Sequence, residues 1–274
     1  MIKADMKRIV LLLLAAFCLT ASQTYGQSEA ERLYGLAYCY QNGVNGYSQD
    51  LSKAYENYKK VAEMGYAPSF YALGCMLEFG QGTSVNLQEA FKWYMKSAKA
   101  GNESGQYSLA WCYRSGIGVE KDDEKAIEWF KACAKKGNLD AYNQAGYILE
   151  CKQSEEANKE AFDLYTLAAN GNDKKQTKAI AEGQYRLAMC YINGVGVDFD
   201  KNGKNADSAR QLLRKSAAHG SEGGKYSQKS EQMLNNPIVV KPMLPVIDFL
   251  DLKDNASNPF TLTIGVKANN VVKK

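Results

Sequence analysis

The stretch D-F-D-K-N-G at residues 198–203 carries oxygen-bearing side chains at alternate positions, followed by a glycine. Short side chains in this pattern converge on a cation at the start of an EF-hand-like loop, where the glycine allows a sharp turn. Asp198, Asp200 and Asn202 are therefore candidate calcium ligands. The twelfth position is Ala209, where such a loop needs a glutamate that binds through both oxygens. A solvated polar loop is the alternative, and we expect no other cofactor.

Nucleophilic and redox chemistry finds little support among the remaining residues. The single histidine, His219, stands just before a glycine at an expected helix end, with no sequence partner for a triad or a metal centre. No Cys-x-x-Cys motif is present. Cys39, Cys112 and Cys190 share one position in a repeat. Equivalent points on successive helix pairs lie about 10 Å apart, already too far for a disulfide, so these cysteines should not bridge one another. We therefore expect core cysteines and a protein without catalysis of its own.

A recurring tyrosine is the best candidate for recognition. It lies two residues from a core leucine, a rotation of about 200° on a helix, so it points away from the leucine face. Such a ladder could offer stacked aromatic surface to a peptide or a glycan. The alternative is that it packs against neighbouring helices. The candidate binding residues are Tyr34, Tyr71, Tyr107, Tyr142 and Tyr185.

These residues recur because the chain is built of five similar units. Each tyrosine stands nine residues before a landmark, which is Gly43, Gly80, Gly116, Cys151 or Gly194. A second segment of each unit carries an alanine with an aromatic residue or leucine four positions on: Ala54/Tyr58, Ala90/Tyr94, Ala126/Phe130, Ala161/Tyr165 and Ala209/Leu213. Helical spacing in both segments predicts two helices per unit. Glycine after the first helix suits a left-handed C-terminal cap.

The phrases G-I-G-V and G-V-G-V, from Gly116 and Gly194, join two expected helices and do not follow a strand. They therefore read as turns and not as phosphate-binding loops. The second helices have start signals, such as the capping-box spacing of Asn86 and Glu89.

The stretch L-A-W-C-Y-R-S-G-I-G-V-E-K-D-D-E-K-A-I-E-W-F-K-A-C-A-K-K-G-N, residues 109–138, resembles a Sel1-like repeat, a relative of the tetratricopeptide helical hairpin. The resemblance covers roughly residues 28–220. It implies an all-α fold, a right-handed α/α solenoid with the first helices on the concave side, which binds other macromolecules. We expect a solenoid over 27–236, with repeats near 30–66, 67–102, 103–138, 139–172 and 176–221 and a capping helix at 222–236. Unit four departs from the repeat pattern at Gln144 and Cys151, and unit five is longer than the other units.

The two ends of the chain do not follow the repeat pattern. Residues 1–26 have the three-part layout of a signal peptide, with cleavage expected near Gly26. The mature chain should then be soluble, periplasmic or extracellular, without a transmembrane segment. Removing Lys3, Lys7, Arg8 and Asp5 leaves 31 basic and 29 acidic residues, a balance that does not favour nucleic-acid binding.

The segment 237–274 contains several prolines, and apolar residues alternate at Phe260, Leu262, Ile264 and Val266. This pattern predicts an extended or β-hairpin tail. An isolated hairpin is marginal in water. The tail must therefore lie along the solenoid, add a strand to a partner's sheet edge, or remain loose.

Taken together, these patterns predict an exported, non-catalytic scaffold or adaptor that mediates protein–protein interaction at the cell envelope through the solenoid surface. The resemblance also implies two alternatives. One is a secreted hydrolase or binder of β-lactams or peptidoglycan fragments, and the other is a glycan-binding helper in polysaccharide export.

Overall fold

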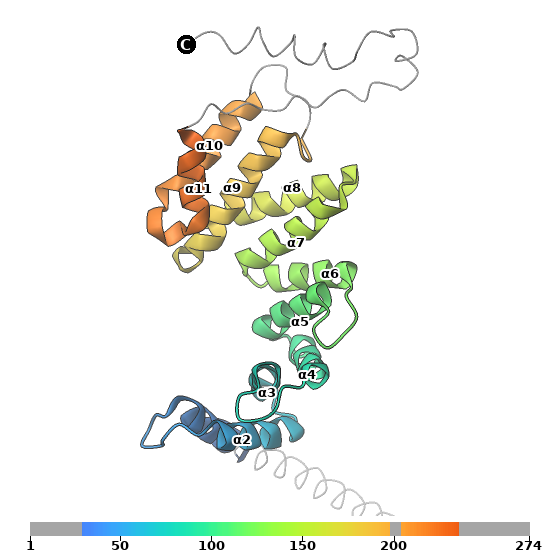
Figure 1. Ribbon diagram of the computed structural model, residues 1–274, viewed down its shortest axis with the longest axis vertical. Coiled ribbons are helices and arrows are strands. Elements are labelled where there is room, and N and C mark those ends of the chain that lie inside the picture. The colour runs from blue at the N-terminus through green and yellow to red at the C-terminus, as the bar shows by residue number, and fades with distance from the viewer. Residues whose placement is uncertain (1–28, 198–203, 236–274) are drawn as a thin grey trace, which may run out of the picture.

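The computed structural model describes residues 29–197 and 204–235 (Figure 1). The expected signal peptide, the candidate calcium loop and the expected tail lie outside the described residues. All regular elements in the described part are helices. A helix over 29–42 precedes α2 (Leu51–Glu63), α3 (Pro68–Phe79), α4 (Leu87–Lys99), α5 (Glu103–Ser115), α6 (Asp123–Ala134), α7 (Leu139–Lys152), α8 (Glu155–Ala169), a 3₁₀ turn η1 (Lys174–Gln176), α9 (Thr177–Asn193), α10 (Lys204–Ala218), a 3₁₀ turn η2 (Gly220–Gly223) and α11 (Lys225–Leu234).

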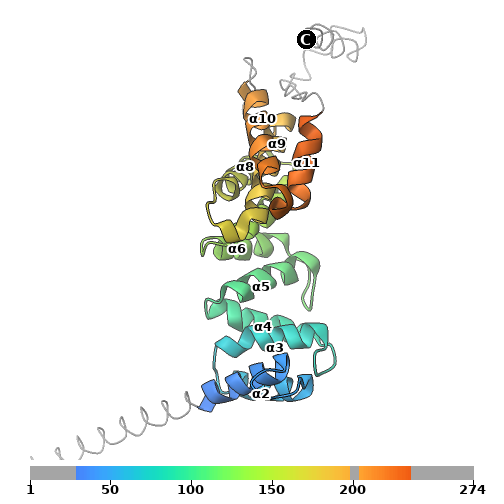
Figure 2. The same ribbon diagram turned by 90° about the vertical axis from the view of Figure 1, so that its left-hand side faces the viewer.

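The helices stack in chain order into one elongated array, from α2 at one end to α10 and α11 at the other (Figures 1 and 2). Each helix contacts the next along the chain, and first helices of successive units also touch, as α7 touches α9 and α9 touches α11. This confirms the predicted all-α solenoid. We call the surface carried by α3, α5, α7, α9 and α11 the first-helix face.

The core lies between the two helices of each unit. The aromatic or leucine landmark of every second helix is at most 1% exposed: Tyr58, Tyr94, Phe130, Tyr165 and Leu213. Gly74 on α3 and Gly146 on α7 leave room for the rings of Tyr94 and Tyr165, because a Cβ at either glycine would lie 2.6–2.7 Å from a ring carbon. The alanine-and-aromatic pattern therefore marks the buried seam of the array.

Side chains and glycines set the ends of the helices as predicted. Asp50, Asn86 and Asp122 each accept a hydrogen bond from the backbone N–H three residues on, at 2.9–3.1 Å. Gly80, Gly116 and Gly194 cap the first helices with φ between 65° and 71°. These caps confirm the predicted left-handed helix ends.

A second glycine, two residues after each of these caps, locks one unit onto the one before it. It also has positive φ, and a Cβ added there would lie 2.0–2.3 Å from a backbone carbonyl oxygen of the preceding unit's second helix. Only a residue without a side chain allows this approach. The pairs are Gly82 with Leu51, Gly118 with Leu87, and Gly196 with Asn158. The phrases G-I-G-V and G-V-G-V are thus turns, as predicted, and also contacts between units.

Unit four is built differently from the sequence prediction. Its first helix does not end at Cys151 but continues to Lys152, and Gln153 takes the left-handed position with φ 56°. The connection to α8 is residues 153–154 alone, whereas residues 80–86 and 116–122 connect the helices of units two and three. The short turn contains no glycine, so unit four has no locking contact of this type with unit three.

Candidate interaction face

The predicted tyrosine ladder packs into the array. Tyr34 contacts Tyr58 with ring centroids 5.5 Å apart, and Tyr71 contacts Tyr94 at 5.9 Å. Tyr107 contacts Phe130 at 5.4 Å. These partners are the buried landmarks of the second helices, and burial raises the pKa of the Tyr107 hydroxyl. Packing therefore accounts for most of the surface of these rings, and a ligand would reach only their half-buried edges.

Tyr142 does not belong to the ladder. Tyr107 is the fifth residue of α5, and the fifth residue of α7 is Asn143. Asn143 is fully buried and donates from Nδ2 to the backbone carbonyl of Ala179 on α9 at 2.8 Å. Tyr142 instead aligns with Gln106. A helix end at Cys151 predicts a register that is one residue off, because the helix continues to Lys152.

A different aromatic set crosses the first-helix face. Tyr147 on α7 lies between two guanidinium groups, that of Arg114 from α5 and that of Arg186 from α9, each 4.9 Å from its ring centroid. Arg114 also lies 4.8 Å from the Trp111 ring, and Arg186 lies 5.7 Å from the Tyr226 ring on α11. We call these five residues the arginine–aromatic stripe. Cations over aromatic faces attract the ring electrons, so the stripe joins four helices.

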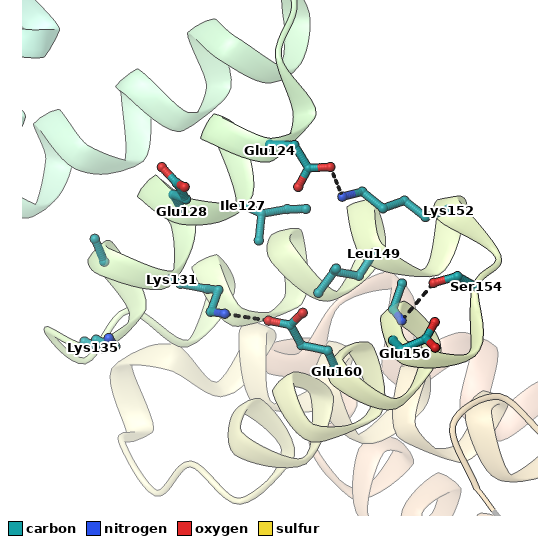
Figure 3. A pocket seen from close by; sticks show the side chains of 12 residues that line it. Glu124, Ile127, Glu128, Lys131, Lys135, Leu149, Lys152, Ser154, Glu156 and Glu160 are labelled. Carbon is teal, nitrogen blue, oxygen red and sulfur yellow. Dashed lines mark hydrogen bonds and ion pairs between the residues drawn. The ribbon is translucent and has the colours of Figure 1, made fainter.

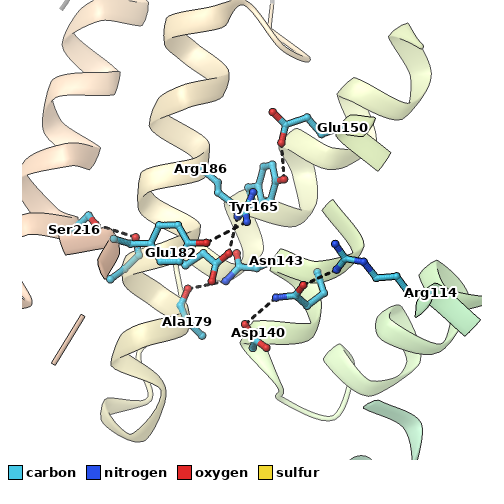
Figure 4. A network of polar contacts seen from close by, with 12 residues as sticks. Arg114, Asp140, Asn143, Glu150, Tyr165, Ala179, Glu182, Arg186 and Ser216 are labelled. Atoms are coloured by element: carbon cyan, nitrogen blue, oxygen red, sulfur yellow. Dashed lines mark hydrogen bonds and ion pairs between the residues drawn. The ribbon is translucent and has the colours of Figure 1, made fainter. Parts of the chain in front are cut away.

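The two arginines of the stripe differ in their surroundings. The Arg186 side chain is 18% exposed, and its Nε donates to Glu182 at 2.7 Å (Figure 4). Burial works against its charge, but attraction from Tyr165 and Glu182 outweighs burial and raises the pKa of the guanidinium. Arg114 donates to Gln144 at 2.8 Å, and no carboxylate of the described residues lies within 4.0 Å of it. Arg186 thus holds the array together, and Arg114 keeps an unneutralised charge.

The acidic side chains near the stripe are all engaged by the protein itself. Glu182 pairs with Arg186, and Glu150 accepts from the Tyr165 hydroxyl at 2.9 Å (Figure 4). Asp140 accepts from the Tyr107 hydroxyl. Glu78 accepts from the Tyr94 hydroxyl at 2.6 Å. The free capacity near the stripe is therefore cationic and aromatic, and the ring of Tyr147, 38% exposed, is an accessible apolar part of it.

A groove of about 720 Å³ runs between α6 and α8 on the other side of units three and four (Figure 3). Ile127 and Leu149 line it, and two ion pairs span it, Lys131 with Glu160 and Lys152 with Glu124. Such exposed pairs each contribute about 0–1 kcal/mol. The groove lies where unit four lacks the longer turn of its neighbours, so we attribute it to that missing turn.

No group of three or more histidine, cysteine or acidic side chains within residues 29–197 and 204–235 could hold a metal ion. The candidate ligands Asp198, Asp200 and Asn202 lie outside the described residues. His219 is partly buried beside Lys174, Lys178 and Glu222. The described helices include none long and apolar enough to cross a bilayer.

The cysteines of the described residues are all free thiols. Cys112, Cys133 and Cys190 are buried, as we predicted for core residues, and burial raises the pKa of each thiol to about 12. Cys151 is exposed.

At pH 8, we expect a thiol reagent to label Cys151 rapidly in the folded chain. A thiol with a pKa near 12 has roughly one thiolate in ten thousand at that pH, so Cys112, Cys133 and Cys190 should react only after denaturant is added. Mass spectrometry of labelled peptides measures this, with Cys151→Ser as control. Fast labelling of Cys190 in native buffer would contradict the packing described above.

The sequence pattern does not reveal the stripe, for a specific reason. Trp111 and Tyr147 occupy the same position, the ninth residue of α5 and of α7, but the slipped register concealed this. Arg114 and Arg186 occupy different positions in their helices, so no periodicity could have shown that both reach one ring.

Comparison with known proteins places the chain in context. A family model described as Sel1 repeat matches residues 28–66, 69–102, 104–138, 140–173 and 181–221. A solved structure of c5321, described as a protective antigen of uropathogenic Escherichia coli strains displaying an SLR fold, is 31% identical with a TM-score of 0.62. The match covers 76% of this chain and 41% of that one, so this chain spans less than half of that protein. A Sel1 repeat protein from Oxalobacter formigenes is 25% identical with a TM-score of 0.61, over 76% of this chain and 87% of that one. No curated protein sequence matches.

Proposed function

The chain belongs to the Sel1 repeat family, and we propose that it is an exported, non-catalytic scaffold that binds another protein of the cell envelope through its first-helix face. Sel1 repeat proteins generally mediate protein–protein interactions. The array supplies an extended surface on a rigid stack of helices, which is how repeat proteins bind their partners. The signal-like sequence of residues 1–26 supports export.

The observation that carries this proposal is the arginine–aromatic stripe. Arginine and tyrosine are enriched among the residues that dominate protein interfaces, because they combine large apolar surface with polar groups. Tyr147 offers an exposed ring held in place by cations on both sides, so little conformational entropy is lost when a partner packs on it. Arg114 offers donors beside that ring without a carboxylate partner in the described residues. A partner with an apolar group next to an acidic one fits this arrangement.

We expect a photocrosslinking amino acid at position 147 to capture one discrete protein in intact cells. The matched control is position 167, because Leu167 is also an exposed apolar residue, 51% exposed, but lies on the second helix α8. Capture at 147 should fall at least tenfold with Arg114→Gln, and the recovered chain should begin near Gln27. Mass spectrometry identifies both proteins. Equal capture at 147 and 167, or capture insensitive to Arg114→Gln, would mean that this face is not the binding surface.

A further inference from the structure

The first helix of unit five begins one turn earlier than its counterparts. α5 and α7 begin four residues before Tyr107 and Asn143, whereas α9 begins at Thr177, eight residues before the equivalent Tyr185. The 3₁₀ turn η1 leads directly into this extra turn. We call residues 174–180 the α9 insertion. Insertions in a repeat array map to one face, which is often a binding face.

The α9 insertion is held firmly against the start of unit four. Gln176 accepts at Oε1 from the backbone N–H of Leu139 at 2.7 Å and donates from Nε2 to the carbonyl of Gly137 at 2.8 Å. The buried Asn143 donates to the carbonyl of Ala179 at 2.8 Å. The insertion therefore presents its side chains from a fixed backbone, so a ligand that binds them orders little of the chain.

A hollow of about 860 Å³ lies between the α9 insertion and the 3₁₀ turn η2. Its charged lining residues are Lys174, Lys175 and Lys178 from the insertion and Glu222 from η2, with His219 beside them. Within the described residues, no carboxylate lies within 4.0 Å of these lysines or of His219. Three lysines against one glutamate give the lining a net charge of +2 with His219 neutral. Such a lining attracts an anion.

Gln184 on α9 adds an unused acceptor to the same hollow. It lines the hollow and is 7% exposed. Its Nε2 donates to the carbonyl of Ala169 at 3.3 Å, but its Oε1 has no hydrogen-bond partner in the described part of the chain. A buried oxygen without a donor is costly, so a ligand hydroxyl that bonds to it is favoured. Glu222 is a second acceptor. The complementary ligand therefore carries hydroxyl groups as well as negative charge.

We propose that this hollow binds a phosphorylated polyol, with the phosphate at the three lysines and a neighbouring hydroxyl donating to Gln184 Oε1. Phosphate is favoured over carboxylate because the lining contains lysines and no arginine. Ammonium groups act as point charges on the several oxygens of a phosphate, whereas paired recognition of a carboxylate is the geometry of arginine. This chemistry has two sources, free polyol phosphates and the phosphoglycerol headgroup of a lipid.

The hollow is separate from the proposed protein-binding surface. None of its lining residues belongs to the arginine–aromatic stripe. A protein partner and a phosphorylated ligand therefore occupy different places on the array, and the photocrosslinking result at position 147 does not bear on this inference.

The test is isothermal titration calorimetry of sn-glycerol 3-phosphate into the chain from residue 27 to residue 274. Lys175→Gln with Lys178→Gln should weaken binding by about tenfold or more, because two charge-assisted contacts to the phosphate are lost. The matched control is Lys92→Gln with Lys99→Gln, which removes the same charge from exposed positions on the distant helix α4 and should leave the affinity unchanged.

A second pair of variants tests the hydroxyl contact. Gln184→Met should weaken binding of sn-glycerol 3-phosphate about fivefold and leave the affinity for inorganic phosphate unchanged, because only the polyol bonds to Oε1. The control is Gln106→Met, since Gln106 on α5 is equally buried and its Oε1 also lacks a partner in the described residues. Circular dichroism verifies folding. If Gln184→Met does not fold, the unchanged chain gives the same information, because it should bind sn-glycerol 3-phosphate about tenfold more tightly than inorganic phosphate or glycerate.

Three results would overturn the proposal: no binding of sn-glycerol 3-phosphate, equal affinity for glycerate or inorganic phosphate, or equal losses in the two double-lysine variants. Sedimentation with vesicles distinguishes the two sources. Binding to phosphatidylglycerol vesicles that is lost with Lys175→Gln and Lys178→Gln, and absent with phosphatidylcholine, supports the proposal with a lipid headgroup as ligand. Binding of sn-glycerol 3-phosphate without binding to either vesicle supports it with a free polyol phosphate as ligand.

Discussion

Gly118→Ala is expected to destabilise the array by about 3 kcal/mol or more, and to do so far more than the same change at Gly116. The two glycines have nearly the same backbone conformation, with φ of 68° and 71°. A Cβ at Gly118 would lie 2.0 Å from the carbonyl oxygen of Leu87, which is backbone and cannot move aside alone. A Cβ at Gly116 would lie 3.5 Å from its nearest neighbour, an ordinary contact.

Gly116→Ala should therefore cost only the strain of a left-handed alanine, about 1–2 kcal/mol. The difference in the free energy of unfolding between the two variants isolates the cost of pushing units two and three apart. Urea denaturation followed by circular dichroism measures both free energies of unfolding. Equal losses at the two positions would show that the close approach between units contributes nothing.

Replacing Arg186 with methionine should cost about 3 kcal/mol, because it leaves the Glu182 carboxylate buried without its partner. The Glu182 side chain is 9% exposed and that of Arg186 is 18% exposed, so water solvates neither well. Breaking such a pair from one side is strongly destabilising, whereas removing both charges costs less. The double variant with Glu182→Gln should therefore recover about 1–2 kcal/mol relative to the sum of the single changes.

The surface pair Lys131 and Glu160 supplies the control, since its side chains are 39% and 40% exposed. Lys131→Met should change stability by less than about 1 kcal/mol. Thermal or urea unfolding of the four variants gives the comparison. If Arg186→Met were no worse than Lys131→Met, the arginine–aromatic stripe would have no structural role at Arg186.

The sequence was sufficient to predict the helices and their order, because their determinants are local. A glycine that ends a helix, an aspartate or asparagine that begins one, and an alanine with an aromatic four residues on can each be read from neighbouring positions. The five-fold recurrence then makes the assignment secure, and the all-α solenoid follows. The candidate calcium loop stays a prediction, since it lies outside the described residues.

What sequence reasoning missed depends on contacts between units. The second glycine of each turn recurs visibly, but its cause is a carbonyl of the preceding unit, such as that of Leu87 beneath Gly118. Unit four was misaligned because a non-glycine residue, Gln153, adopts the left-handed cap conformation there. That single error placed Tyr142 in the ladder and concealed the equivalence of Trp111 and Tyr147. Side chains that meet across three helices have no fixed spacing along the chain.

The short turn of unit four has a mechanical consequence. Glycine contacts join unit one to two, two to three, and four to five, but none of this type joins three to four, where the groove with its two ion pairs lies instead. The junction of units three and four therefore depends on side-chain contacts, such as those of Arg114 with Tyr147 and Gln144, and not on a glycine packed against a backbone carbonyl. Side-chain substitutions should weaken this junction more than the three junctions that a glycine contact closes.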